Sequence, residues 1–318
     1  MQPQSYPCRA WPERSIEQVW RAPDGWPCRL LRLSPPADVR PRGSLLFLGG
    51  RGDQIEKHVE AIARWAAMGW EVSALEWRGQ AGAGRLLPDA RIGHSPGFDR
   101  WIDDLAAFGR EWRAHGMAPH VAIAHSMGGH LLLKAMVEGA FLPDAAVLTA
   151  PMLGLQTRPL PVPVGAWIAR TMCALGLGNR AAWDHGDKPI AGMAQRQARL
   201  THSAERYSDE MWWREQRPDL ALGGPSWAWL RDAFASTLAM PTDPRLSAMS
   251  VPALILAARH DRLVSTAAAE KIARRLPDAQ FHCYGAVAGH ELLREADDVR
   301  DDVLARIDTF LDARAPAG

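Results

Sequence analysis

The sequence VAIAHSMGGH, residues 121–130, decides the fold, because it joins an apolar run to a helical segment through a serine set among small residues. A nucleophile elbow is a strained strand-to-helix turn that exposes a reactive serine. It needs small residues two positions before and two after the serine, where the two backbones come close. Ala124 and Gly128 meet this steric need around Ser126. We therefore interpret Ser126 as a candidate nucleophile; the alternative is a serine that caps an ordinary helix.

Short apolar runs recur along the chain, and most are followed by a segment with helical spacing, such as 55–68 and 266–276. This alternation predicts an α/β fold, with a mostly parallel central sheet covered by helices on both faces. Near the N-terminus, residues 19–21 and 28–33 flank a Pro-Asp-Gly turn and predict a β-hairpin. The predicted strands of the parallel part are 44–49, 71–77, 120–125, 145–150, 253–258 and 280–284.

The alternation stops between about Pro151 and Pro244, where no strand is predicted and six of the 14 tryptophans lie. Such a segment is too long for a plain loop, and helical pieces such as 164–175 predict a helical cap. We expect an α/β core formed by 1–151 and 245–318. The cap, residues 152–244, would cover the carboxyl ends of the strands, where open α/β sheets bind ligands.

The composition is that of an ordinary globular protein. Lys and Arg total 37 and Asp and Glu total 36, so the net charge gives no reason to expect a nucleic-acid partner. Four scattered cysteines, no signal-like segment and no apolar run of membrane-spanning length predict a cytoplasmic protein, with transient contact to a membrane surface left open. Asp184-His-Gly-Asp187 could supply metal ligands, but without distant partners it is better interpreted as a solvated loop.

A serine nucleophile needs a base, and the base needs an acid that orients it; in this fold the chain order is serine, acid, histidine. Asp261 follows the predicted strand 253–258, and His290 lies in the loop after 280–284. Asp261 could instead cap a helix, and His290 could be an ordinary histidine. Their joint occurrence in the required order favours a catalytic role. His282 lies within a predicted strand, which makes His290 the better base.

The negative charge that develops on a substrate carbonyl oxygen needs N–H donors that are already in place. One donor would be the amide of Met127, directly after the serine, and the other the amide of Arg51 in the glycine-rich turn 49–52. The same glycines could cradle a phosphate. Neither GxGxxG nor GxxxxGK[ST] stands at this turn, so the phosphate cradle is the weaker interpretation.

These residues resemble the serine α/β-hydrolases, and the likeness spans about residues 15–313. Several stretches are similar to the branch of bacterial lysophospholipases and monoacylglycerol lipases, including two in the predicted cap. They are Gly49–His58, Glu76–Arg85, Ala124–Gly129, Leu200–Tyr207 and Leu222–Trp227. The chain departs from that pattern at Gly49, where many relatives have His, at Ala124, which replaces the first glycine of the elbow, and at Glu76, which replaces a common Asp.

The resemblance implies roles for the candidate residues. Ser126, Asp261 and His290 would form a catalytic triad, and Arg51 and Met127 would donate to the oxyanion. None of the departures removes a catalytic group, but Gly49 would alter how the oxyanion loop is held.

We expect an enzyme that hydrolyses carboxylic esters through an acyl-enzyme, with no metal and no cofactor. A Trp-rich cap favours a lipid-like ester, first a lysophospholipid or monoacylglycerol and second a smaller ester. Gly50, His125 and Trp227 are expected to line the substrate site. The alternatives are an acyltransferase, which would use the same residues, and a non-catalytic member of the fold that binds a ligand or partner.

Overall fold

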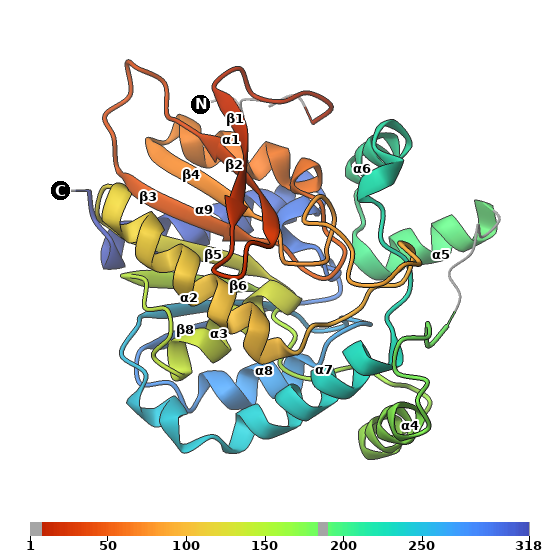
Figure 1. Cartoon of the computed structure of the whole chain (residues 1–318). Helices are drawn as coiled ribbons and strands as arrows, with labels where there is room; N and C mark the ends of the chain where they lie inside the picture. The colour runs from red at the N-terminus through yellow and green to blue at the C-terminus, as the bar shows by residue number, and fades with distance from the viewer. Residues whose placement is uncertain (1–7, 184–189, 318) are drawn as a thin grey trace.

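The computed structural model describes residues 8–183 and 190–317, so the Asp184-His-Gly-Asp187 motif lies outside the described residues. An eight-stranded sheet runs through the molecule in the order β1-β2-β4-β3-β5-β6-β7-β8 (Figure 1). The strands are β1 (Ser15–Arg21), β2 (Pro27–Leu33), β3 (Gly43–Leu48), β4 (Trp70–Leu75), β5 (His120–His125), β6 (Ala145–Thr149), β7 (Ala253–Ala258) and β8 (Ala279–Tyr284).

The sheet is parallel from β4 to β8, and β2 alone runs against the other strands. β1 pairs with β2, and β2 with β4, in antiparallel fashion. Each of the remaining neighbours, from the β3–β4 pair to the β7–β8 pair, is parallel. Two neighbouring parallel strands must be joined by a crossover that passes over one face of the sheet. This is why strands and helices alternate along the chain. The structure confirms the expected α/β fold and the hairpin.

Helices cover both faces of this sheet (Figure 1). On one face α1 and α9 bury Ile62, Trp65 and Phe310 against the strands. On the other, α2, α3 and α8 contribute to a second apolar cluster that includes Trp101 and Leu131. Each such side chain, when fully buried, stabilises the fold by about 1.5–3 kcal/mol. The helices are α1 (Val59–Ala67), α2 (Phe98–His115), α3 (Met127–Val137), α8 (Thr266–Ala273) and α9 (Asp297–Arg314).

The chain between β6 and β7 contains helices and, within its described part, no strand of the sheet. Helix α4 lies at the edge of the molecule in Figure 1, away from the sheet. Helix α7 instead places Trp229 and Phe234 in the same apolar cluster as α2 and α3. The division into a core and a cap at 152–244 stays a prediction. The helices of this segment are α4 (Val162–Ala174), α5 (Ile190–Leu200), α6 (Ala204–Gln216) and α7 (Trp227–Ala239).

Element ends differ by a few residues from the expected ones. The segment expected as one helix over 55–68 begins with a 3-10 turn, Ile55–His58, because the backbone at His58 is not helical, with φ −111° and ψ 10°. Helix α3 starts at Met127, directly after Ser126. Within the described ranges, none of the helices has both the length and the apolar character needed to cross a bilayer. The other 3-10 turns are Pro218–Leu220, Met240–Thr242, Pro244–Ala248 and Leu292–Arg294.

Candidate active site

Ser126 occupies the turn between β5 and α3 in a strained backbone conformation, with φ 52° and ψ −116°. A positive φ at a residue with a side chain costs free energy, and such strain gathers at functional sites. The Ser126 backbone N–H donates to the Thr149 carbonyl at 3.0 Å, which anchors the turn to β6. Its hydroxyl makes no capping hydrogen bond to α3. The structure therefore contradicts the interpretation of Ser126 as an ordinary helix cap.

Small residues flank Ser126 because the backbones of neighbouring elements come close to each other at this turn. A Cβ added at Gly128 would lie 2.7 Å from the Leu48 carbonyl oxygen, so β3 leaves no room for a side chain at that position. Ala124, two residues before Ser126, is fully buried within β5, and the turn forms with its methyl group present. The elbow thus tolerates one methyl on the strand side but none on the helix side.

Three loops bring Ser126, His290 and Asp261 together. His290 Nε2 lies 2.9 Å from Ser126 Oγ, and His290 Nδ1 lies 2.6 Å from Asp261 Oδ2. The other carboxylate oxygen of Asp261 accepts the backbone N–H groups of Leu263 and Val264 at 2.8 and 3.0 Å. Asp261 therefore holds its own loop and faces His290, and it does not cap the helix that follows.

Electrostatics keep Asp261 ionised and orient His290. Burial raises the pKa of Asp261, but His290 and the two backbone N–H donors outweigh this effect, and the pKa lies below its ordinary value. Burial lowers the pKa of His290, but the Asp261 carboxylate and its hydrogen bond outweigh it, and the pKa is raised. An ionised Asp261 favours the tautomer with the proton on Nδ1. His290 Nε2 is then an acceptor for the Ser126 hydroxyl proton.

The loop after β3 lies directly against the serine. A Cβ at Gly50 would lie 3.0 Å from the Ser126 Cβ, which puts the next residue, Arg51, at the edge of the elbow. The amide N–H groups of Arg51 and Met127 have no hydrogen-bond acceptor in the part of the chain that the structure describes. Two such N–H groups beside a serine hydroxyl can bind an oxyanion.

Asp53 holds this loop, and the sequence reasoning missed it. Its Oδ2 accepts the Gly50 N–H at 2.8 Å and lies 3.2 Å from His58 Nε2, and its Oδ1 accepts from Lys57 Nζ at 2.7 Å. Burial raises the pKa of Asp53, but Lys57 and His58 outweigh it, so the carboxyl pKa lies well below its usual range. Gly49 thus lies in a loop that Asp53 anchors through the Gly50 N–H.

Lys57 extends this contact to the histidine loop and to α6. Its Nζ lies 2.5 Å from Glu291 Oε1, next to His290, and 3.7 Å from Glu210 Oε2 on α6. Arg294 pairs with both of these glutamates. Lys57 and Glu291 are 234 positions apart, and no local pattern marks them as partners. The only sequence signal was the i, i+4 spacing of Asp53 and Lys57.

His125 and Trp227, two of the residues expected to line the substrate site, lie in different parts of the molecule. The His125 ring lies between those of His58 and His290, at centroid distances of 6.0 and 4.9 Å. Burial, helped by the charge of His290, lowers the pKa of His125 to about 3, so it is neutral at pH 7. Trp227 begins α7 and is half-buried against the core. Its contact with substrate, like that of His125, stays a prediction.

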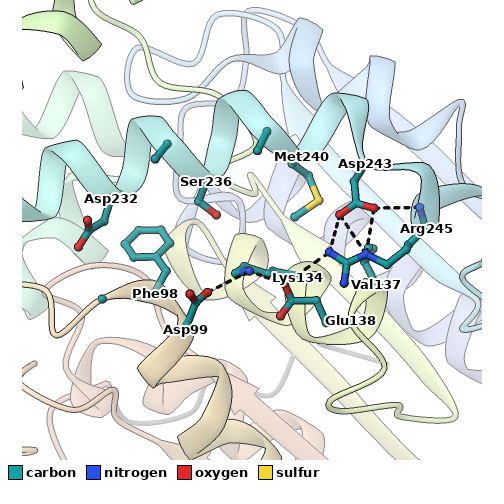
Figure 2. A pocket seen from close by; sticks show the side chains of 13 residues that line it. Phe98, Asp99, Lys134, Val137, Glu138, Asp232, Ser236, Met240, Asp243 and Arg245 are labelled. Atoms are coloured by element: carbon teal, nitrogen blue, oxygen red, sulfur yellow. Dashed lines mark hydrogen bonds and ion pairs between the residues drawn. The ribbon is translucent and has the colours of Figure 1, made fainter. Parts of the chain in front are cut away.

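One groove lies away from these residues, between the start of α2, α3 and the end of α7 (Figure 2). It has a volume of about 360 Å³ and is crossed by ion pairs such as Lys134–Asp99 and Arg245–Asp243. It contains none of the predicted site residues. Within the described residues there is also no group of three or more His, Cys, Asp or Glu side chains that could hold a metal ion.

The family model described as "Serine aminopeptidase, S33" matches residues 39–297, most of the chain. The chain belongs to this serine aminopeptidase S33 family. The matched range includes Ser126, Asp261 and His290. Membership agrees with the α/β-hydrolase fold and the serine chemistry expected from the sequence.

Similar proteins carry lysophospholipase names. Lysophospholipase L2 of Escherichia coli K12 is 27% identical over 337 residues, covering 97% of this chain and 91% of that protein. The probable lysophospholipase L2 of Haemophilus influenzae is 26% identical over 276 residues, covering 86% and 85%. A soluble variant of monoglyceride lipase from Saccharomyces cerevisiae, solved with a substrate analog, has a TM-score of 0.74 at 17% identity and covers 99% of this chain and 100% of that one. That last likeness supports the fold alone.

Proposed function

We propose that this S33 family member is a serine hydrolase that cleaves carboxylic esters of lipids, with a lysophospholipid or a monoacylglycerol as substrate. The observation that carries the proposal is the continuous hydrogen-bonded path from Asp261 through His290 to Ser126, on a strained turn. The names of the lysophospholipase L2 relatives support the substrate class.

In the proposed mechanism, His290 Nε2 takes the proton of Ser126 as its Oγ attacks the ester carbonyl carbon. The amides of Arg51 and Met127 bind the oxyanion of the tetrahedral intermediate. His290 returns the proton to the leaving alcohol, and the acyl group stays on Ser126. A water molecule, deprotonated by His290, then releases the fatty acid. Asp261 holds the imidazole and stabilises its positive charge in both steps.

An ester fits the site better than the N-terminus of a peptide. An aminopeptidase must bind the ammonium group of its substrate, for which it needs an uncommitted carboxylate near the nucleophile. The nearby carboxylates of Asp53, Glu210 and Glu291 are engaged by Lys57, and the last two also by Arg294. This argues for a substrate without a cationic group at the reacting end.

The region between β6 and β7 suits a lipid substrate. We assign residues 152–244 as a cap whose helix α4 meets lipid aggregates transiently. Large apolar side chains are exposed on α4, at Val164 and Trp167, and just outside its two ends, at Leu160 and Leu175. A surface of this kind marks a membrane or protein contact more often than a solvated face.

The thiols of Cys28, Cys173 and Cys283 form no disulfide, which agrees with a cytoplasmic location.

Covalent labelling with a fluorophosphonate tests the proposal. We expect the label on Ser126, found by mass spectrometry of the modified peptide, and its loss in Ser126→Ala. An exposed serine far from the site, Ser247, supplies the matched control Ser247→Ala, which should label like the wild type. Loss of lysophosphatidylcholine and monoacylglycerol hydrolysis should accompany the loss of label.

Other outcomes would point to the alternatives. A folded wild type that takes no label but binds a lipid would favour a non-catalytic binding protein. Label on Ser126 with release of acylated alcohol, and little free fatty acid, would favour an acyltransferase. Turnover of amino-acid naphthylamides with none of the lipid esters would contradict the proposed substrate class.

A further inference from the structure

The side chain of Arg51 extends from the loop beside Ser126 toward α7. Its guanidinium group lies 5.5 Å from the centre of the Trp229 ring and donates one hydrogen bond, at 3.0 Å, to the Gly223 carbonyl. These contacts hold the group in place. A guanidinium has five N–H donors, and only this hydrogen bond uses one within the described chain.

Arg51 has no carboxylate within ion-pair distance among the described residues, although it is partly buried. Other buried arginines of this molecule are paired: Arg29 with three glutamates and Arg294 with two. Burying a cation without an anionic partner is costly, so such a group is retained where something else supplies the negative charge. Burial and the charges of Arg214 and Arg196 lower the pKa of Arg51 to about 10, although the Asp53 carboxylate raises it, and the group is still charged at pH 7.

Two further arginines make the surroundings of Arg51 electropositive. Arg214 and Arg196 share the carboxylate of Glu210, at 3.5 and 2.6 Å, but Glu210 also pairs with Arg294 and lies 3.7 Å from Lys57. Lys57 and Arg294 also pair with Glu291, and Lys57 with Asp53. These three carboxylates still carry one charge fewer than the four cations, before Arg51 is counted. The side chains of Arg196 and Arg214 are 38% and 26% exposed, so solutes can reach them.

We propose that Arg51, assisted by Arg214 and Arg196, binds the phosphate group of the substrate's headgroup next to Ser126. This inference rests on the proposed function and narrows its substrate class to lysophospholipids. The planar fork of a guanidinium matches phosphate oxygens and gives charge-assisted hydrogen bonds. A monoacylglycerol lacks this anion and would leave the guanidinium without its partner.

The specificity test compares two substrates with the same acyl chain, 1-palmitoyl lysophosphatidylglycerol and 1-palmitoylglycerol. The readout is the ratio of their kcat/KM values, because any effect of a substitution on the shared oxyanion step cancels in the ratio. Arg51→Gln should lower the ratio by about 10- to 100-fold, the range of a lost hydrogen bond to a charged group. Arg51→Lys should restore part of it. Arg214→Gln, which leaves the Arg51 loop intact, should lower it by about threefold.

The matched control is Arg231→Gln, since Arg231 is exposed on α7 and paired only with its neighbour Asp232 among described residues. It should leave the ratio as in the wild type. If Arg51→Gln slows both substrates equally, the side chain only supports the loop and the proposal is wrong.

A binding experiment separates this inference from the proposed function. Glycerol 3-phosphate and inorganic phosphate are titrated into the wild type and Arg51→Gln by calorimetry. Binding that Arg51→Gln weakens at least tenfold supports the site. Preference for glycerol 3-phosphate indicates a lipid headgroup, and equal binding indicates that phosphate alone suffices. No binding of either would overturn the site. A wild type that binds glycerol 3-phosphate yet hydrolyses neither lipid would instead contradict the proposed function.

Discussion

His290 is subject to two opposing effects, and their balance sets the pH at which the site can work. Burial lowers the pKa of its imidazole, but the contact with Asp261 raises it above the ordinary value. The base must be neutral to accept the Ser126 proton. Activity should therefore fall with decreasing pH through this raised pKa, and the acid limb of the kcat/KM profile should lie above the pKa of about 6.5 of a free histidine.

Replacing the acid tests this balance. Asp261→Asn removes the charge that raises the His290 pKa and favours the wrong tautomer. We expect kcat to fall by about 10⁴-fold, as in other serine triads, and the acid limb to move to lower pH. Both are measured with a soluble ester between pH 5 and pH 9. An unchanged acid limb would mean that another group controls the profile. Asp298→Asn, an exposed carboxyl on α9, is the control and should leave rate and profile unaltered.

The sequence predicted the residues whose signals are local and missed those whose partners are distant. Ser126 stands in a recognisable turn, and Asp261 and His290 each follow an apolar strand, so the chain order alone suggested their meeting. Asp53 and Lys57 showed only their i, i+4 spacing, which does not reveal that Asp53 accepts the Gly50 N–H or that Lys57 pairs with the distant Glu291.

Among the elements, one buried cation adds side-chain contacts to the backbone pairing between the N-terminal hairpin and β4. Arg29 on β2 pairs with Glu56 in the 3-10 turn through both carboxylate oxygens, at 2.6 and 3.0 Å. It also pairs with Glu76 after β4 at 3.2 Å and with Glu17 on β1 at 2.7 Å. Burial and Glu56 raise the pKa of Glu76 to about 7 even though Arg29 lowers it.

Arg29→Met should therefore destabilise the protein by about 3–5 kcal/mol at pH 7, because buried carboxylates lose their cation. The measurement is urea unfolding. Without Arg29, the pKa values of the buried glutamates in the folded variant should rise above their values in the unfolded chain. Protonation at pH 5 then favours the folded state, so the loss of stability should be smaller at pH 5 than at pH 7. The exposed Arg21 on β1 supplies the control Arg21→Met, expected within about 0.5 kcal/mol of the wild type. A loss at pH 5 as large as at pH 7 would contradict this account.

Element types were easier to predict than their roles. The parallel strands are fully or largely apolar, so their runs stood out, and the hairpin was marked by its turn. The 3-10 turn at Ile55–His58 was not foreseen, because Glu56 and His58 are buried there by ion pairs and not by apolar periodicity. Likewise Trp229, which meets Arg51, could not be told from Trp227 by sequence.

At the scale of the whole molecule, one ionic cluster joins the site to the segment between β6 and β7. Lys57 belongs to the turn before α1, Glu291 and Arg294 to the loop of His290, and Glu210 to α6. Arg196 and Arg214 pair with Glu210 of this cluster, and their charges lower the pKa of Arg51. A substrate that binds under these helices would meet the nucleophile and the cations together, while α4 stays at the periphery (Figure 1).

That position of α4 leads to a prediction on lipid aggregates. Trp167 is 65% exposed on α4, and inserting it into a bilayer would bury most of its surface. Trp167→Ser should weaken binding to phosphatidylglycerol vesicles by about tenfold or more, because the variant loses the binding free energy gained by burying one large apolar side chain. Hydrolysis of a monomeric short-chain ester should change by less than about twofold, since no reacting group moves.

Leu238, half exposed near the end of α7, is the matched control, because Leu238→Ser removes a similar apolar side chain from a helix that borders the groove of Figure 2. Vesicle binding is measured by co-sedimentation of all three proteins. Weaker binding of Trp167→Ser alone would place the lipid contact at α4. Equal binding by the two variants and the wild type would mean that substrate enters from solution, and the exposed apolar face of α4 would need another occupant.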